Sequence, residues 1–387
     1  MILMYEVFDR KAVSNYIFQD AICKGYSIHS PSAVSLWEML LNNLLECFVE
    51  ELGEIKVINT VPSLIDSNIL TEFYGDYFYR IENRIPDFVD DEGNRRFITT
   101  DELPYLVSRL KQSDILFSAY TVVRPRSFAV KPFLREEFIR YFQFVISSDK
   151  MNIDKCIENI KRAAIRFFKQ IRVSVILVDR NSDSYYSKKS CFHSVWMNGN
   201  IESVLQCGIL RKRFDSLSGK DRIIIDIGGA QRMLASFIYT NSDMHGLFLP
   251  YHMRNVDIII RSNKKTNILS KFEKIVSAAG CRIKIIYDNM PLKKIKKMAI
   301  AESVLAIVVQ RVSEGKEFLT VYNRDMTKTD IYIDRNIEEW IKHKYNIIEN
   351  LPYDKQVAII NSQVDEKNSN FRKGNKSYSI IKEGLFA

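Results

Sequence analysis

The sequence lacks any apolar run long enough to cross a bilayer, and it lacks a recognisable secretory signal. A transmembrane helix needs roughly 20 consecutive apolar residues, and no run in the chain approaches that length. The opening apolar residues are followed at once by Asp9, Arg10 and Lys11, with no cleavage site of small residues. We therefore expect a cytoplasmic protein with no membrane partner.

Metal-binding and disulfide patterns are also missing. The chain has six cysteines and five histidines, without CxxC, HxH or HExxH spacing. Structural zinc usually takes four ligands, so the neighbouring Cys191 and His193 are too few to make a site. We expect the cysteines to be reduced and mostly buried thiols, and we predict no metal site built from protein ligands.

Apolar and basic residues, in contrast, are plentiful. Apolar residues make up 46% of the 387 positions and charged residues 27%, which is typical of a globular protein, and this length predicts two domains. Lysine and arginine number 56 against 47 acidic residues, a net charge of +9. This surplus favours a polyanionic partner such as RNA or a nucleotide, although a lysine-rich composition also produces basic proteins that bind no polyanion.

Periodicity predicts a first domain, residues 1–252, with an antiparallel sheet flanked by helices. Apolar residues recur at helical spacing over 35–52, and Gly53 ends that helix. The row 222–239 predicts a strand, a turn at two glycines and a helix. The other predicted elements are a strand ending at Pro62, a hairpin turning at 91–93, a helix over 101–112, strands over 118–126 and 136–147, a helix over 152–170, a strand over 173–178 and a loop over 179–190.

A second domain, residues 253–350, is predicted to be small and α/β, and residues 351–387 are predicted to be a polar extension. Over 256–340, strands alternate with helices of about ten residues, a pattern of parallel or mixed sheets. Four lysines lie on the predicted helix 291–300. They favour contact with an RNA backbone, and the alternative is a solvated helix face.

Several charged residues are candidates for a phosphate site. Arg124 and Arg126 lie in the basic loop between two predicted strands, where guanidinium groups can pair with phosphate oxygens or simply be solvated. Arg232 follows the two glycines early in a predicted helix, a place where a cation can meet a phosphate. Thr100 and Glu102 stand at a predicted strand-to-helix junction. They could cap the helix or bind an ammonium group, and the sequence alone leaves both interpretations open.

In this order, the segments resemble a class II aminoacyl-tRNA synthetase of the prolyl, threonyl and histidyl subgroup, in a shortened and divergent form. The helix and strand of 35–62 resemble the first class II motif, which implies a homodimer. RPRSFAVKPFLREEF resembles the second motif, and DIGGAQRMLASFIYTNSDMHGLFLP, residues 226–250, resembles the third. Residues 256–345 resemble the anticodon-binding domain, which implies binding of tRNA or another RNA.

The resemblance implies an amino acid substrate, with ATP and Mg²⁺ as cofactors. FITTDEL at 97–103 is similar to the family's Thr-x-Glu loop, so Thr100 and Glu102 would bind the amino group of the substrate. Arg124 would bind the α-phosphate of ATP and Arg232 the γ-phosphate, both as catalytic residues. Gly208 belongs to the segment 199–214, which resembles the part that closes the proline pocket. Further residues implied in ATP binding are Arg126, Glu137, Phe138 and Gln206.

The chain departs from the family pattern at several of these positions. Arg126 stands where the family has the glutamate that contacts the adenine amino group, and Glu137 stands where it has an arginine. Ile139 takes the place of the aromatic residue that stacks on the base, unless a one-residue shift brings Phe138 there. Gly208 is followed by Ile-Leu-Arg instead of Thr-Ser-His, and the bacterial editing insertion is absent.

Two functions stay open on the sequence alone. One is ATP-dependent activation of an amino acid as its adenylate, with transfer to tRNA or another acceptor. The other is a paralogue that has lost catalysis and serves as a nucleic-acid-binding or regulatory accessory subunit. The fold alone does not decide between them, because one fold hosts many functions.

Overall fold

The computed structural model describes most of the chain in two compact units, which part between Phe237 and Ile238. The described residues are 17–18, 28–58, 64–75, 87–98, 101–110, 114–123, 133–134, 136–148, 152–180, 185–195, 201–211, 223–243, 246–287, 290–313, 316–324, 327–331 and 379–381. The large unit holds the described residues up to Phe237 together with 379–381, and the small unit holds those from Ile238 to 331.

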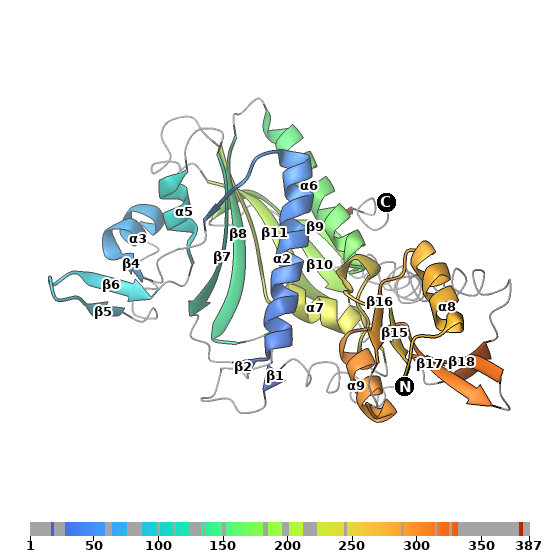
Figure 1. The fold of residues 1–387 in the computed structure, drawn as a ribbon. Helices are drawn as coiled ribbons and strands as arrows, with labels where there is room; N and C mark the ends of the chain where they lie inside the picture. Colours follow the sequence, from blue (N-terminus) through green and yellow to red (C-terminus); the bar gives the residue numbers. More distant parts are fainter. Residues whose placement is uncertain are drawn as a thin grey trace. The chain divides into compact units, whose positions relative to one another are not determined.

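The large unit is built on a sheet that has eight strands in the described part of the chain (Figure 1). All neighbouring strands are antiparallel except β3 and β7, which run parallel. Their order across the sheet is β20 (Ser379–Ile381), β9 (Val175–Arg180), β10 (Tyr186–Val195), β11 (Ile201–Leu210), β12 (Ile223–Ala230), β8 (Phe138–Ser148), β7 (Ile115–Val123) and β3 (Lys56–Ile58). The predicted antiparallel sheet is confirmed.

One face of this sheet is covered by the long helices α2 (Pro31–Leu52) and α6 (Ile153–Gln170), which lie side by side in Figure 1. The side chain of Ser30 caps α2 by accepting a hydrogen bond from the Ala33 N–H, and Gly53 ends the helix at a φ of 90°. The Phe48 ring stacks on Phe144 of β8, with ring centroids 4.5 Å apart. We call this side of the sheet the helix face.

The opposite face carries the residues that alternate with those of the helix face, and we call it the open face. At one end it is covered by α3 (Ser67–Tyr74), α5 (Leu103–Arg109) and a small sheet of β4 (Leu64–Asp66), β6 (Arg95–Ile98) and β5 (Asp87–Val89). Leu106 and Phe97 pack there with Leu116 and Val145 of the large sheet. The hairpin predicted at 91–93 is confirmed, because β5 pairs antiparallel with β6.

Two local predictions for the large unit are wrong. Residues 186–190 belong to strand β10 instead of a loop, because their polar side chains do not prevent pairing with β9 and β11. Gly228 and Gly229 lie inside β12 instead of forming a turn, and they pair there with Gln143 and Phe142 of β8. In both cases cross-strand pairing outweighs local composition.

The small unit has a mixed five-stranded sheet within the described residues, in the order β16-β15-β17-β18-β19. Strand β15 (Ile258–Arg261) runs parallel to β16 (Ile283–Ile286) and β17 (Ala306–Ser313), whereas β17, β18 (Lys316–Asn323) and β19 (Lys328–Ile331) are antiparallel. The predicted mixed sheet is therefore confirmed. The helix predicted near 336–343 lies outside the described residues.

Helices α8 (Asn267–Ala278) and α9 (Leu292–Ala301) cover the two faces of this sheet. Phe272 of α8 packs with Ile258 and Ile260, and Ile295 of α9 packs with the alternating residue Ile259. This alternation explains why β15 is apolar throughout. No described helix of the chain is long and apolar enough to span a membrane.

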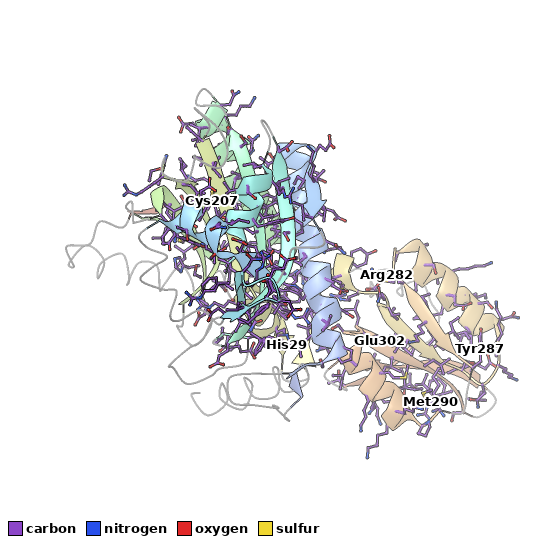
Figure 2. All side chains as sticks on the ribbon, turned by 90° about the vertical axis from the view of Figure 1, so that its left-hand side faces the viewer. His29, Cys207, Arg282, Tyr287, Met290 and Glu302 are labelled. Carbon is purple, nitrogen blue, oxygen red and sulfur yellow. The ribbon has the colours of Figure 1, made fainter. Side chains whose placement is uncertain are left out.

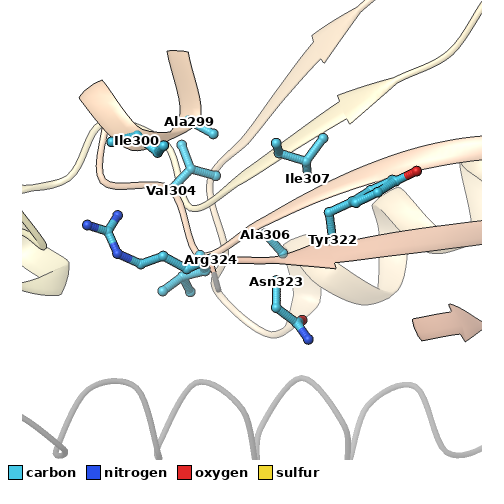
Figure 3. Close-up of a pocket in the computed structure, with 9 residues that line it drawn as sticks. Ala299, Ile300, Val304, Ala306, Ile307, Tyr322, Asn323 and Arg324 are labelled. Carbon is cyan, nitrogen blue, oxygen red and sulfur yellow. The ribbon is translucent and has the colours of Figure 1, made fainter. Parts of the chain in front are cut away.

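A buried ion pair anchors the segment that leads into the small sheet. Asp257 is fully buried, its Oδ2 lies 2.8 Å from Arg282 Nε, and its Oδ1 lies 3.5 Å from Arg254 Nη1. Figure 2 labels Arg282 in the small unit. The guanidinium group of Arg282 also lies 4.3 Å from the centre of the Tyr251 ring. This segment consists of β13 (Ser242–Asp243), β14 (Gly246–Leu247) and the 3-10 helix η4 (Tyr251–Met253).

Candidate functional site

A cavity of about 150 Å³ opens in the large unit where β8, β11 and β12 meet the start of helix α7 (Arg232–Thr240). Its described wall combines apolar side chains and backbone with five polar side chains: Glu136, Ser203, Gln206, Gln231 and Arg232. The apolar and backbone part of the wall comprises Phe133, Leu134, Ile139, Tyr141, Val204, Leu205, Gly228, Gly229 and Ala230.

Strand alternation and one glycine shape this cavity. Ile139 and Tyr141 of β8 project to the open face, whereas Phe142 packs on the helix face. Gly228 lies beside Tyr141, and a Cβ at that glycine would lie only 2.6 Å from the tyrosine hydroxyl. Gly228 therefore leaves room for the Tyr141 ring against the strand, which forms one wall.

Glu136 is the buried carboxylate of the cavity, with 2% of its surface exposed. Its Oε2 accepts a hydrogen bond from Gln231 Nε2 and lies 3.3 Å from His29 Nε2. Its Oε1 finds no hydrogen-bond partner among the described residues. His29 ends strand β2 (Ile28–His29), just before α2 (Figure 2), and its ring centroid lies 4.5 Å from that of Phe133.

Gln231 is held in one orientation by the backbone of β8. Its Oε1 accepts a hydrogen bond from the Arg140 N–H at 2.9 Å, and its own N–H donates to the Arg140 carbonyl at 2.9 Å. Because a backbone N–H can only donate, the Gln231 amide must turn its NH₂ group toward Glu136. This fixed amide therefore presents a donor to one oxygen of Glu136.

The structure brings together two of the predicted ATP-binding residues. Arg232 is the first residue of α7, and its Nε donates to the carbonyl of Leu134 at 3.2 Å. Gln206 of β11 lines the same cavity. The guanidinium group at a helix start and the glutamine amide both suit an anionic or polar ligand, and their roles in ATP binding stay predictions.

Other predicted residues lie elsewhere. Phe138 is 41% exposed and does not line this cavity, whereas its neighbour Ile139 does, so a role for Phe138 in ATP binding stays a prediction. Glu137 does not line the cavity either, and its neighbour Glu136 does. Thr100, Arg124 and Arg126 lie outside the described residues.

A second polar group crosses the open face as a chain of hydrogen bonds. Tyr120 Oη donates to Gln143 Oε1 at 2.6 Å, and Gln143 Nε2 donates to Asp226 Oδ1 at 2.7 Å. The Tyr186 hydroxyl donates to the other oxygen, Asp226 Oδ2. Burial raises the pKa of Asp226 to about 6, although the hydrogen bonds from Tyr186 and Gln143 lower it in part.

Gly208 lies underneath this chain of hydrogen bonds. Its neighbour across the sheet is Asp226, and the ring of Tyr186 rests directly on its backbone, where a Cβ would overlap the ring. The absence of a side chain at Gly208 thus lets Tyr186 reach Asp226 across β11. The space above Gly208, which the family resemblance implies for the substrate, holds the Tyr186 ring.

Glu102 lies at the start of α5 with 1% of its surface exposed. It is the N-cap residue but makes no side-chain capping bond, and Asp101 Oδ1 accepts the N–H of Leu103 instead. Among the described residues Glu102 Oε2 has no hydrogen-bond partner. Burial, and to a lesser extent the charge of Asp101, raise the pKa of Glu102 to about 8.

Sequence reasoning missed most polar residues of these groups, among them the two buried acids Glu136 and Asp226 and the partner of Asp226, Tyr186. Asp226 had a detectable signal, because it is the single charged residue in the apolar strand β12, and a buried acid needs partners. Glu136 and Tyr186 had none, since each lies in a polar stretch of the sequence.

No protein-family model and no curated protein matches the chain. Among solved structures, the prolyl-tRNA synthetase of Giardia lamblia in complex with prolyl-adenylate is similar, with a TM-score of 0.74 and 14% identity over 93% of this chain and 82% of that chain. Two prolyl-tRNA synthetase structures from Cryptosporidium parvum are similar as well. One, complexed with halofuginone and AMPPNP, has a TM-score of 0.72 and 15% identity, and covers 93% of this chain and 80% of that chain.

The other Cryptosporidium parvum structure, complexed with L-proline and AMP, has a TM-score of 0.70 and 16% identity over 93% of this chain and 81% of that chain. Identities of 14–16% establish a shared fold and leave the activity open. The chain therefore has the fold of a class II aminoacyl-tRNA synthetase, of the kind seen in prolyl-tRNA synthetases.

Proposed function

We propose that the protein activates an amino acid with ATP, forming an aminoacyl-adenylate and releasing pyrophosphate, and transfers the aminoacyl group to tRNA or another acceptor. The observation that carries this proposal is that Gln206 of β11 and Arg232 at the start of α7 line one cavity on the open face. Two of the solved structures with this fold are complexes with AMPPNP or AMP, which agrees with a nucleotide site.

The chemistry needs positioned charges and little proton transfer. The carboxylate oxygen of the amino acid attacks the α-phosphorus of ATP, and the bond from that phosphorus to the bridging oxygen of pyrophosphate breaks. The protein must orient two anions and neutralise charge that develops on the phosphate. Arg232 would bind the triphosphate from the start of α7, and Arg124 would neutralise the α-phosphate.

The described residues fit ATP better than they fit a separate metal ion. The cavity offers a guanidinium group at Arg232 and, at Glu136, an acceptor that has no partner among the described residues. Glu136 is the one carboxylate in the described wall of the cavity, and its Oε2 already accepts a hydrogen bond from Gln231. Mg²⁺ would therefore arrive bound to the triphosphate, where it supplies additional positive charge.

Glu102 would bind the ammonium group of the amino acid, together with Thr100. Without a ligand, burial keeps the Glu102 carboxyl protonated at neutral pH, since its pKa is about 8. An ammonium group beside it would favour the ionised form and form a charge-assisted hydrogen bond. Binding of the amino acid should therefore release a proton from the protein between pH 5 and 8.

The remaining assignments concern partners and location. The lysines of α9 would contact tRNA, since Lys293, Lys294 and Lys297 are exposed and Lys296 Nζ lies 5.1 Å from the centre of the Tyr322 ring. By resemblance, the protein would form a homodimer through the first motif and act in the cytoplasm. The catalytic-like domain would cover residues 1–252, the anticodon-binding-like domain 253–350 and the extension 351–387.

The second candidate is a synthetase paralogue without catalysis that binds nucleic acid or regulates a partner. The observation that favours it is the Tyr186 ring on Gly208, because the protein's own side chain fills the space where an amino acid side chain was expected. Under this hypothesis, the buried hydrogen bond from Tyr186 to Asp226 is part of the folded core.

Amino-acid-dependent exchange of pyrophosphate into ATP distinguishes the two candidates. We expect exchange with one of the common amino acids or a proline analogue, and a loss of roughly 100-fold or more in Arg232→Ala, since removal of one positioned charge typically costs that much. Arg162→Ala is the matched control, because this arginine pairs with Glu51 at 3.1 Å on the helix face. Lack of exchange with every amino acid, together with retained tRNA binding, would establish the non-catalytic candidate.

A further inference from the structure

On the open face, one level of β11 and β12 separates the apolar cluster under α5 from the cavity. The residues of these two strands that face this side come at three successive levels: Leu210 and Ile224 in the apolar cluster, Gly208 and Asp226 in the middle, and Gln206 and Gly228 at the cavity. A strand rises about 3.4 Å per residue, so neighbouring levels lie roughly 7 Å apart. The middle level is therefore the floor between the start of α5 and the cavity.

The amino acid of the proposed reaction has to lie over this middle level. Glu102, which would bind its ammonium group, stands at the start of α5, and the next residue, Leu103, belongs to the same apolar cluster as Leu210. At its other end, the carboxylate has to reach the α-phosphorus of a nucleotide bound in the cavity. The α-carbon of the substrate lies between these two ends, so a side chain that points toward the sheet enters the space above Gly208 and Asp226.

The ring of Tyr186 already fills that space. It rests on the backbone of Gly208 so closely that a Cβ at this glycine would overlap it. Its hydroxyl donates a hydrogen bond to Asp226, which is 1% exposed, and Lys189 Nζ lies 4.7 Å from the centre of the ring. Moving the ring aside would deprive a buried carboxylate of one of its donors, which costs free energy. The ring is therefore a fixed part of the site.

From this packing we propose that Tyr186 restricts the substrate to the smallest amino acids, glycine first and alanine second. The inference rests on the proposed function, since it names the substrate class of that site. Glycine has only a hydrogen atom where other amino acids carry a side chain, so it needs no room above Gly208. A branched or cyclic side chain would overlap the ring, because a close-packed wall yields little to extra atoms. Tyr186 is thus a specificity-determining residue, and its position on Gly208 is compatible with catalysis.

The ring and the hydroxyl of Tyr186 can be removed one at a time, which distinguishes selection by size from a merely structural role. Tyr186→Ala removes the ring and opens the space above Gly208, so it should admit larger side chains. Tyr186→Phe keeps the ring and removes only the hydrogen bond to Asp226, so it should keep the wild-type order of substrates. A structural role alone would lower the activity of both variants toward every amino acid and leave that order unchanged.

The experiment measures amino-acid-dependent exchange of pyrophosphate into ATP by the full chain, as kcat/KM for glycine, alanine, valine and proline. We expect the wild type to prefer glycine over valine and proline by roughly 100-fold or more, since a single methylene already changes kcat/KM by about 10- to 200-fold. In Tyr186→Ala this ratio should fall by about 10-fold or more, through a gain of activity with valine or proline. Tyr186→Phe should keep the wild-type ratio, whatever its rate.

The wild type alone supplies a measurement that needs no variant to fold. Exchange with valine, proline or another large amino acid that equals or exceeds exchange with glycine would overturn the inference and leave the proposed function in place. An unchanged preference for glycine in a folded Tyr186→Ala would overturn it as well. If the wild type exchanges with none of the amino acids, the proposed function fails together with the inference.

Discussion

The buried carboxyl group of Glu102 should make the unliganded protein less stable as the pH rises. Its pKa increases from 4.5 to about 8 because burial disfavours the charged form. At a pH between the two pKa values, the folded state holds a proton on Glu102 that the unfolded chain has released. The contribution of Glu102 to the free energy of unfolding is therefore complete below the unfolded pKa and is lost as the pH rises through the folded pKa. At 1.36 kcal/mol for each unit of pKa, the loss between pH 5 and pH 8 is on the order of 3 kcal/mol.

Glu102→Gln isolates this effect, because the neutral amide has nearly the same shape. We expect urea unfolding to show wild type and variant with similar stability near pH 5, and the wild type weaker by a few kcal/mol near pH 8. The raised pKa of Asp226 acts in both proteins and cancels from the comparison. Parallel stability curves for the two proteins over this pH range would refute the argument, since they would mean that Glu102 is ionised or hydrated in the folded state.

Three further predictions concern the packing around Asp226 and Asp257. Gly208→Ala should lower the free energy of unfolding by about 1–3 kcal/mol, because its Cβ overlaps the Tyr186 ring, and an unchanged urea midpoint would contradict that packing. Tyr186→Phe should cost about 1–3 kcal/mol and raise the pKa of Asp226 further, because the lost hydrogen bond lowers that pKa; NMR titration of the carboxyl resonance measures it. Arg282→Ala should destabilise the small unit by roughly 3 kcal/mol, since it removes a partner of the buried Asp257. Hydrogen exchange of the β15 amides should then be faster, and an unchanged exchange rate would mean that the pair contributes little.

Most elements of the fold could be predicted from the sequence because each buries one face or both. Helix α2 repeats apolar residues at helical spacing and ends at Gly53, and β15 is a continuous apolar run covered on both sides. The start of β10 could not be predicted, because residues 186–190 are mostly polar and their strand pairing depends on β9 and β11. Local composition carries no information about a partner strand that stands elsewhere in the chain.

The candidate site, like the fold, could be predicted from the sequence only in part. Gln206, Arg232 and Glu102 were named because short motifs resemble those of a family, and their neighbours in the sequence carry that signal. Glu136 depends on Gln231, which is 95 positions away, and Asp226 depends on Gln143, which is 83 positions away. Such contacts follow from the register of the sheet, which a single sequence does not display.

The hydrogen-bonded chain from Tyr120 through Gln143 and Asp226 to Tyr186 also bears on how the sheet avoids misfolding. Its members come from β7, β8, β12 and β10, and they meet only when all these strands are correctly aligned. A slip of one residue in β12 would turn Asp226 to the helix face, among apolar side chains that offer it no donor. The four polar side chains thus favour one strand alignment. A misaligned sheet that apolar packing alone would tolerate is destabilised because it loses these buried hydrogen bonds.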